Sequence, residues 1–469
     1  MLFSTNPISR TNVVVIAAFS LILSACGGGG GSSAPAAPVT PPPTQVSTPK
    51  PPTTPVATMG CGTVTSTGTG NSTQVVVDGF PCAVAGGAGA VNAPQVPYVS
   101  VKICAPGSTT NCQIIDHIIL DTGSTGLRIA ASALSSALKV GAGLTVASNA
   151  ASTTLTECET YVDSFVYGPV VTADVYIAGK SALGTTMQIF GDTDFAVPSA
   201  CSSNAGTETD TVQTFGGNGL LGVNFNTFDY SKYFNCNNGS LSTCTEVTYN
   251  TFQGWLPSIV TQFAADNNGV VITMPKVGAS GSLTAVVGAL YFGVGTQANN
   301  TPSSTTPVLA LQNDGANDPT FGTFAVQVAG TGTWTSAYID SGTDTVYFDD
   351  PADTALIACP SKEYYSGFYC PTSPQNIGFS YANFGTTTSL ATVSMSVTSP
   401  LLFNANIVAF DNAAGSTGTS TTLNSEVALG LSTFFGHTNY FLFSGKTAPG
   451  TGFGGTASTT VTGPMNGIQ

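Results

Sequence analysis

The chain has 469 residues, of which 42% are hydrophobic and only 7% are charged, against a usual charged fraction of about 25%. Its 10 Lys and Arg residues and 24 Asp and Glu residues give a formal net charge of −14. This balance, with no basic run, excludes binding to a nucleic-acid backbone. The 54 glycines and the many Ser, Thr and Asn residues favour a turn-rich β protein over a helical bundle.

Residues 1–25 have the features of an export signal. Arg10 precedes an apolar run, from Val13 to Ile22, that is too short to span a bilayer comfortably. The following Leu23-Ser24-Ala25-Cys26 resembles the lipobox of bacterial lipoproteins, in which the cysteine is lipidated and becomes the mature N-terminus. The alternative is an ordinary signal peptide that contains a cysteine. Glycine rather than aspartate after Cys26 favours, by the same resemblance, the outer membrane of a bacterial cell envelope.

Residues 26–60 are rich in Gly, Pro and Thr and cannot bury a core, so we expect a tether between the lipid and the globular part. The lipid is then the only contact with the membrane. From residue 61 the sequence is that of a folded protein.

The cysteine count agrees with export. If Cys26 carries lipid, ten cysteines remain, and an even number in an exported chain predicts disulfides. Sequential pairing is the simplest connectivity, because three pairs bracket short polar loops, although spacing alone leaves other pairings open. The ten are Cys61, Cys82, Cys104, Cys112, Cys158, Cys201, Cys236, Cys244, Cys359 and Cys370.

No metal or cofactor is expected. No Cys-x-x-Cys motif occurs, and the only histidines, His117 and His437, are isolated. His117 lies in an apolar strand and His437 in a terminal loop, so neither suits a Ser-His-Asp triad. Both are interpreted as structural.

Short strands dominate the sequence from residue 96 onward. Two of the predicted strands, Asp116–Leu120 and Trp334–Ile339, each lead into a D-[TS]-G-[ST] motif, and the two motifs start at Asp121 and Asp340. Helix is expected only at residues 132–140 and 256–265.

The repeated motif suits a pair of facing carboxyl groups. Two carboxylates held close together cannot both ionise, so they share a proton. One can then remove a proton from a water molecule while the other protonates the substrate. Glycine permits the tight turn below each carboxyl group, and the neighbouring hydroxyls can hold the pair coplanar. The supporting residues are Thr122, Gly123, Ser124, Ser341, Gly342 and Thr343.

The sequence resembles the pepsin-like aspartic proteases, in which each of two β lobes contributes one such loop. That family also has a hydrophobic-hydrophobic-Gly segment that supports each loop; here the matching residues are Leu220, Leu221 and Gly222 in the first lobe and Ala428, Leu429 and Gly430 in the second. The resemblance covers residues 96–445 and implies an all-β, bilobal double barrel with few short helices and a central interlobe sheet. We expect an N-terminal lobe at residues 61–300 and a C-terminal lobe at 301–469. The whole is also similar to a bacterial lipoprotein family of pepsin-like sequence whose activity is not defined.

Several positions depart from the pepsin pattern. Tyr161 is the candidate for the flap aromatic, with Tyr167 as the alternative, and either could instead be a core residue. The first motif is followed by Gly126, Leu127 and Arg128, whereas pepsins usually place a tryptophan soon after it. Asp344 adds a carboxyl group beyond the second motif and is expected to raise the apparent pKa of the pair. No lysine-rich pro-segment precedes the lobes.

Two functions fit the resemblance. In the first, the protein is a tethered, monomeric endopeptidase that cleaves a peptide or protein substrate with Asp121 and Asp340. In the second, the same cleft binds a peptide or cell-envelope ligand without cleaving it. Intact aspartates and hydroxyls in both motifs favour the endopeptidase.

Overall fold

The computed structural model describes residues 67–79, 94–147, 153–162, 164–203, 206–237, 240–247, 256–312, 322–349, 353, 355–360, 365, 367–404, 407–416, 426–450, 453 and 459–469. The expected signal peptide (residues 1–25) and the whole expected tether (26–60) lie outside these residues and stay predictions. Cys26, Cys61 and Cys82 also lie outside them. None of the helices in this part of the chain is long and apolar enough to cross a membrane.

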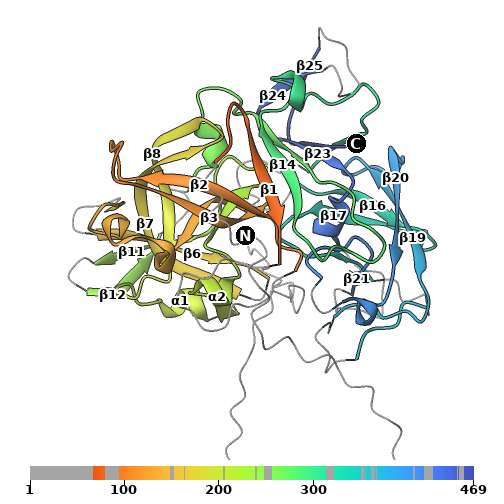
Figure 1. The fold of residues 1–469 in the computed structure, drawn as a ribbon, viewed down its shortest axis with the longest axis horizontal. Coiled ribbons are helices and arrows are strands. Elements are labelled where there is room, and N and C mark those ends of the chain that lie inside the picture. Colours follow the sequence, from red (N-terminus) through yellow and green to blue (C-terminus); the bar gives the residue numbers. More distant parts are fainter. Residues whose placement is uncertain are drawn as a thin grey trace, which may run out of the picture.

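The first half of the chain is built almost entirely of β-strands, many with buried apolar side chains (Figure 1). Its strands are β1 (Ser72–Val77), β2 (Tyr98–Cys104), β3 (Cys112–Asp121), β4 (Thr125–Ala130), β5 (Thr145–Val146), β6 (Thr153–Thr160), β7 (Ser164–Ile177), β8 (Lys180–Phe190), β9 (Thr207–Glu208), β10 (Gly219–Val223), β11 (Lys232–Asn237), β12 (Ser240–Glu246), β13 (Gly269–Thr273) and β14 (Val286–Phe292). The long β7 pairs with both β6 and β8.

The second half carries a separate seven-stranded sheet. It contains β16 (Phe324–Val328), β17 (Trp334–Ile339), β18 (Val346–Tyr347), β19 (Gln375–Ala382), β20 (Ala391–Val397), β21 (Ala414–Gly415) and β22 (Glu426–Leu429). Most neighbours are antiparallel, but β17 runs parallel to β22 and β18 runs parallel to β21. The expected two-lobed all-β fold is confirmed.

Strands from distant parts of the sequence connect the two halves. The late strand β23 (Thr438–Leu442) pairs with β13, and β26 (Met465–Ile468) lies between β23 and β15 (Val308–Ala310). Figure 1 shows β1, β14 and β23 between the strands of the two halves. A further short hairpin consists of β24 (Thr447–Pro449) and β25 (Thr460–Thr462). The proposed lobe boundary at residue 300 stays a prediction, although β15, β23 and β26 belong to the sheet of the first half.

The two helix predictions are wrong. Residues 132–140 form only the 3-10 turns η1 (Ala131–Ala133) and η2 (Ser136–Leu138), because the backbone at Leu134 and Ser135 is extended. Residues 256–265 contain only η4 (Ile259–Gln262), which buries its first two side chains against the barrel. Pro257 at the start of that segment disfavours helix in the preceding residue.

Among the described residues, the α-helices are single turns. They are α1 (Ser199–Ser202) and α2 (Val212–Phe215), and the remaining 3-10 turns are η5 (Ala298–Asn300), η6 (Pro400–Leu402) and η7 (Leu431–Thr433). Helix α2 begins with a capping box between Thr211 and Thr214 and ends at Gly216 in a left-handed conformation.

Candidate active site

Each D-[TS]-G motif lies at the end of a strand that runs beside a parallel partner. Asp121 is the last residue of β3, and Asp340 directly follows β17. Strand β10 pairs in parallel with β3 and antiparallel with β4, so it passes through the loop that joins them. Strand β22 has the same relation to β17 and β18 in the second half. The two halves therefore present their aspartates on equivalent loops.

A glycine on each inserted strand makes this close approach possible. A Cβ atom on Gly222 would lie 2.6 Å from the backbone of Ser124, and one on Gly430 would lie 2.1 Å from the carbonyl oxygen of Thr345. Both distances are far below any normal contact. The hydrophobic-hydrophobic-Gly segments thus lie where the resemblance implied, against the two loops.

The two loops are joined directly by hydrogen bonds between their second residues. The backbone amide of Thr122 donates to Ser341 Oγ at 3.1 Å, and the amide of Ser341 donates to Thr122 Oγ1 at 2.9 Å. Each hydroxyl then donates to a backbone carbonyl of the opposite half, Thr122 to Ile339 and Ser341 to Leu120. All of these groups are buried, so the bonds are shielded from water.

Each carboxylate also has its own set of donors. Asp121 accepts hydrogen bonds from the Gly123 amide, at 2.8 Å, and from the Ser124 hydroxyl. Asp340 accepts from the Gly342 amide and from the Thr343 hydroxyl, both at 2.7 Å. The two motifs therefore make the same contacts, position by position.

The glycines of the two motifs show that the carboxyl groups face each other. A Cβ atom on Gly123 would lie 2.7 Å from the carboxyl group of Asp340, and one on Gly342 would lie 2.7 Å from Asp121 Oδ1. Any larger residue at either position would push against the opposite carboxyl group. Glycine is therefore required here by contact between the halves.

The electrostatics of the pair separate the roles of the two aspartates. Burial, and then the charge and hydrogen bonding of Asp121, raise the pKa of Asp340 well above that of an ordinary aspartate. The two carboxyl groups therefore hold one proton as a pair, and the raised pKa favours Asp340 as the group that carries it. Such an arrangement can offer a base and an acid to the same bound molecule.

The hairpin of β6 and β7 carries the two candidate flap residues. Tyr161 lies at its turn, where its amide donates to the Ser164 carbonyl at 2.7 Å, and its ring contacts Phe215 with centroids 6.0 Å apart. The hydroxyl of Tyr167 is buried and donates to Thr156. These positions suit Tyr161 as the flap residue, which stays a prediction, and make Tyr167 a core residue.

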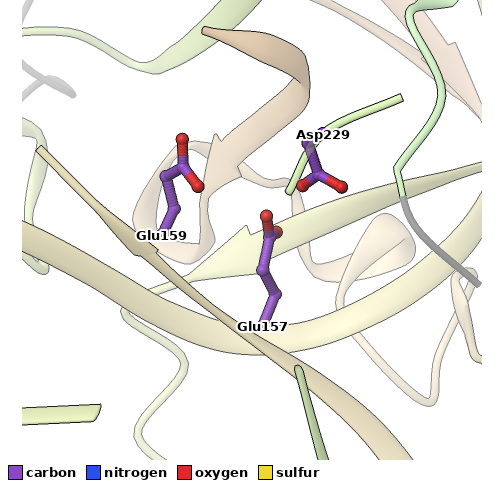
Figure 2. Close-up of side chains that lie close together, drawn as sticks. All are labelled: Glu157, Glu159 and Asp229. Carbon is purple, nitrogen blue, oxygen red and sulfur yellow. The ribbon is translucent and has the colours of Figure 1, made fainter. Parts of the chain in front are cut away.

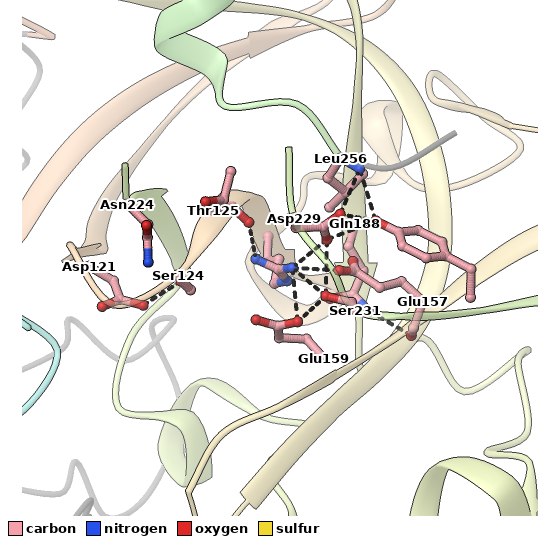
Figure 3. A network of polar contacts seen from close by, with 12 residues as sticks. Asp121, Ser124, Thr125, Glu157, Glu159, Gln188, Asn224, Asp229, Ser231 and Leu256 are labelled. Carbon is pink, nitrogen blue, oxygen red and sulfur yellow. Dashed lines mark hydrogen bonds and ion pairs between the residues drawn. The ribbon is translucent and has the colours of Figure 1, made fainter. Parts of the chain in front are cut away.

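A charged cluster that the sequence interpretation missed lies beside Asp121. The guanidinium of Arg128 on β4 is fully buried, with its Nη2 atom 2.5 Å from Glu157, 3.3 Å from Glu159 and 2.9 Å from Asp229. Figure 2 shows that the three carboxyl groups lie close together. Figure 3 shows the network of hydrogen bonds and ion pairs around them, next to Asp121 and Ser124. A lone arginine within the apolar run 127–130, in a chain with only 10 basic residues, was the available signal.

Four disulfides are present among the described cysteines: Cys104–Cys112, Cys158–Cys201, Cys236–Cys244 and Cys359–Cys370. All four agree with sequential pairing.

His117 lies on β3 away from the aspartate pair, where its Nε2 atom is 2.9 Å from Asp78 and its Nδ1 atom 3.5 Å from Asp116. Asp344 accepts a hydrogen bond from the Tyr347 hydroxyl at 2.9 Å, and burial raises its pKa to about 6.

These features define a two-lobed β protein with one carboxyl group from each half at a shared site. Residues 68–457 match the model of a family described as "Protein of unknown function (DUF3443)", and the chain belongs to this family. No curated protein matches the chain. Among solved structures, an aspartic proteinase from Irpex lacteus is similar, with a TM-score of 0.47 and 13% identity over 85% of this chain and 96% of that one.

Proposed function

We propose that the protein is an aspartic-type endopeptidase whose paired carboxyl groups are Asp121 and Asp340. The observation that supports this most directly is the matched set of donors on the two carboxyl groups, combined with glycines that leave room only for the opposite carboxyl. A cleft that only binds a ligand would not need matched hydrogen-bond donors on both Asp121 and Asp340.

The mechanism follows from the proton that the pair shares. Asp121, in its ionised form, removes a proton from a water molecule held between the carboxyl groups, and that water attacks the carbonyl carbon of a peptide bond. Asp340, which retains its proton, donates it to the carbonyl oxygen, so that a tetrahedral gem-diol forms. The proton that Asp121 took from water then passes to the amide nitrogen as the C–N bond breaks, and a gem-diol hydroxyl returns a proton to Asp340. The products are a carboxylic acid and an amine, and the pair again carries one proton. The hydroxyls of Ser124 and Thr343 keep the outer oxygens oriented. The proposed chemistry uses these side chains and water alone.

The test is cleavage of a denatured protein by the purified chain between pH 3 and pH 7. A statine-type inhibitor should block the cleavage, and EDTA should have no direct effect on it. Tight binding of the inhibitor without any cleavage would instead favour the peptide-binding lipoprotein.

We also propose that Cys26 carries a lipid that anchors the protein to a bacterial outer membrane. The four disulfides agree with an oxidising, extracytoplasmic compartment. Cys26→Ser should release the protein into the soluble fraction, because one lipid group is the only proposed anchor. Retention of that variant in the membrane fraction would contradict the proposal.

A further inference from the structure

The cluster around Arg128 connects two elements that are separate in the sequence, strand β4 and the β6–β7 hairpin. Arg128 belongs to β4, which begins directly after the loop of Asp121. Glu157 and Glu159 belong to β6, the first strand of the hairpin that carries Tyr161. Because side chains two residues apart on a strand share a face, both glutamates point to the guanidinium. The cluster therefore fastens the hairpin to the strand that holds the aspartate loop.

The charges in this cluster do not balance. Three carboxyl groups have oxygen atoms within 4.8 Å of one another and share a single cation, in a place where Arg128 and Glu157 are fully buried. A fully ionised cluster would bury two excess negative charges, which is very unfavourable in a protein interior. Glu157 Oε2 also has no hydrogen-bond partner among the described residues. At least one carboxyl group must therefore hold a proton in the closed arrangement.

The carboxyl spacing is also that of a cation site, but the cation within it is the guanidinium. Arg128 Nη2 contacts all three carboxyl groups, its Nη1 atom donates to the Thr125 carbonyl at 2.8 Å, and the side chain is inaccessible to solvent. A metal ion would have to displace it. The arrangement is an internal ion cluster rather than a site for a ligand.

Glu159 is the member of the cluster closest to solvent. Its side chain is 12% exposed, whereas that of Glu157 is fully buried and that of Asp229 is 3% exposed. It accepts a hydrogen bond from Ser231. The charged groups that act on it are Arg128 on β4, Glu157 on β6 and Asp121 at the end of β3. Glu159 in turn acts on Tyr161 at the hairpin turn and on Asp229 before β11, whose pKa is raised well above the ordinary value, mainly by burial. Tyr233 on β11 contacts the cluster through a hydrogen bond to Asp229.

We infer that this cluster is a proton-dependent clamp, in which protonated Glu159 holds the β6–β7 hairpin against the aspartate loop and ionised Glu159 releases it. Release exposes the Glu159 carboxylate to water and removes its repulsion from Glu157 and Asp121. Closing the hairpin requires uptake of one proton. The clamp controls only the position of the β6–β7 hairpin. It therefore does not depend on whether the aspartate pair cleaves peptides.

The direction of the pH dependence follows from the two environments of Glu159. Burial raises the pKa of Glu159 most strongly and the charge of Glu157 adds to it, so that the value reaches about 7 despite the neighbouring Arg128; the ordinary value is 4.5. A carboxyl group whose pKa is higher in the closed state favours that state at low pH. Opening therefore becomes easier as the pH rises from about 4.5 to about 7 and changes little above that range.

Hydrogen exchange measured by mass spectrometry on the intact protein tests the clamp. Peptides from residues 153–177 should lose at least about tenfold in protection between pH 5 and pH 7, after correction for the intrinsic exchange rate. Peptides from the β19–β20 hairpin provide the internal reference and should keep their protection. Constant protection of residues 153–177 over this range would overturn the inference.

Two variants identify the proton-binding group. Glu159→Gln keeps the size of the side chain but cannot ionise, so its hairpin should stay protected at pH 7. Glu246→Gln is the matched control, because Glu246 is exposed on β12 and β12 belongs to the same extended sheet. It should behave as the wild type does. A wild-type pH response in Glu159→Gln, or its loss in Glu246→Gln, would contradict the assignment.

Discussion

Thr122 and Ser341, which are 219 residues apart in the sequence, exchange hydrogen bonds across the junction of the two halves. Each hydroxyl accepts from the backbone amide of the other residue and donates to a carbonyl of the opposite half. The distance between the two aspartate loops is thus set by four buried hydrogen bonds, each between one of these two hydroxyls and a backbone group.

Removing either hydroxyl should weaken this junction. Thr122→Val and Ser341→Ala should each reduce the free energy of unfolding by about 1–3 kcal/mol, because each leaves buried amide and carbonyl groups without partners. The double variant should lose less than the sum, with a coupling of at least about 0.5 kcal/mol, since the two hydroxyls hold the same two loops together. Urea unfolding of the four proteins measures this coupling. Strict additivity would show that the two hydroxyls act independently.

The proposed catalytic pair predicts a sharp loss of activity on single substitutions. Asp121→Asn and Asp340→Asn should each abolish hydrolysis of a denatured protein, because neither variant can share one proton between two carboxyl groups. The control is Asp194→Asn, since Asp194 is an exposed aspartate in a turn. Near-ultraviolet circular dichroism should show that all three variants are folded. Wild-type turnover in either of the first two would refute the assignment.

The pH dependence of hydrolysis should follow the pair. The rate requires one net negative charge on the two carboxyl groups, so it should fall when Asp340 also ionises. Because burial and Asp121 raise the pKa of Asp340, we expect this fall at a higher pH than an ordinary aspartate would give, and a mildly acidic optimum. A profile of kcat/KM from pH 3 to pH 9 tests this. A rate that stays constant above pH 5 would argue against a shared proton.

His117 makes stability depend on pH in the alkaline range. Burial alone lowers the pKa of His117, but hydrogen bonds to Asp116 and Asp78 outweigh it and raise the value to about 9, against 6.5 for an ordinary histidine. The stabilisation is fully present below about pH 6.5 and is lost as the pH rises through 9. Unfolding in urea at pH 6.5 and pH 9.5 should differ by about 1–3 kcal/mol more in the wild type than in His117→Gln. Equal differences in the two proteins would exclude this role.

The four disulfides should contribute unequally. Cys158–Cys201 closes a loop with a sequence separation of 43, and Cys104–Cys112 one with a separation of 8. Because a longer loop loses more chain entropy in the unfolded state, replacing the first pair by serines should cost about 1.5 kcal/mol more than replacing the second. Thermal unfolding of the two double variants measures the difference. A larger cost for Cys104–Cys112 would indicate that local strain or packing dominates.

The sequence predicted those parts of the structure that depend on local pattern. Apolar strands followed by D-[TS]-G-[ST] predicted β3 and β17 and the loops after them, because strand propensity and turn chemistry agree there. The motif also implied that Gly123 and Gly342 lie below a carboxyl group. Each of these glycines is also required because the carboxyl group of the other half lies against it. This contact depends on how the two halves meet, and a local sequence pattern does not predict it.

The predictions that were wrong, and the cluster that was missed, all depend on contacts between residues far apart in the sequence. Residues 132–140 and 256–265 contain helix-forming side chains, but the barrel buries their apolar residues in short turns, and this tertiary burial outweighs propensity. The cluster of Arg128 was missed because its members come from β4, β6 and the segment before β11. Asp344 was expected to act on the aspartate pair, whereas the structure turns its carboxyl group to Tyr347.

The position of β26 has a consequence for biosynthesis. Residues 465–468 hydrogen-bond on one side to β15 and on the other to β23, and β23 in turn pairs with β13 of the first half. A ribosome or an export channel that delivers the chain from its N-terminus releases these residues after β13, β15 and β23. Until then, β15 and β23 each have an unpaired edge that could join a strand of another nascent chain. Completion of this sheet therefore follows delivery of β26, and a chain that lacks residues 465–468 would keep both edges open.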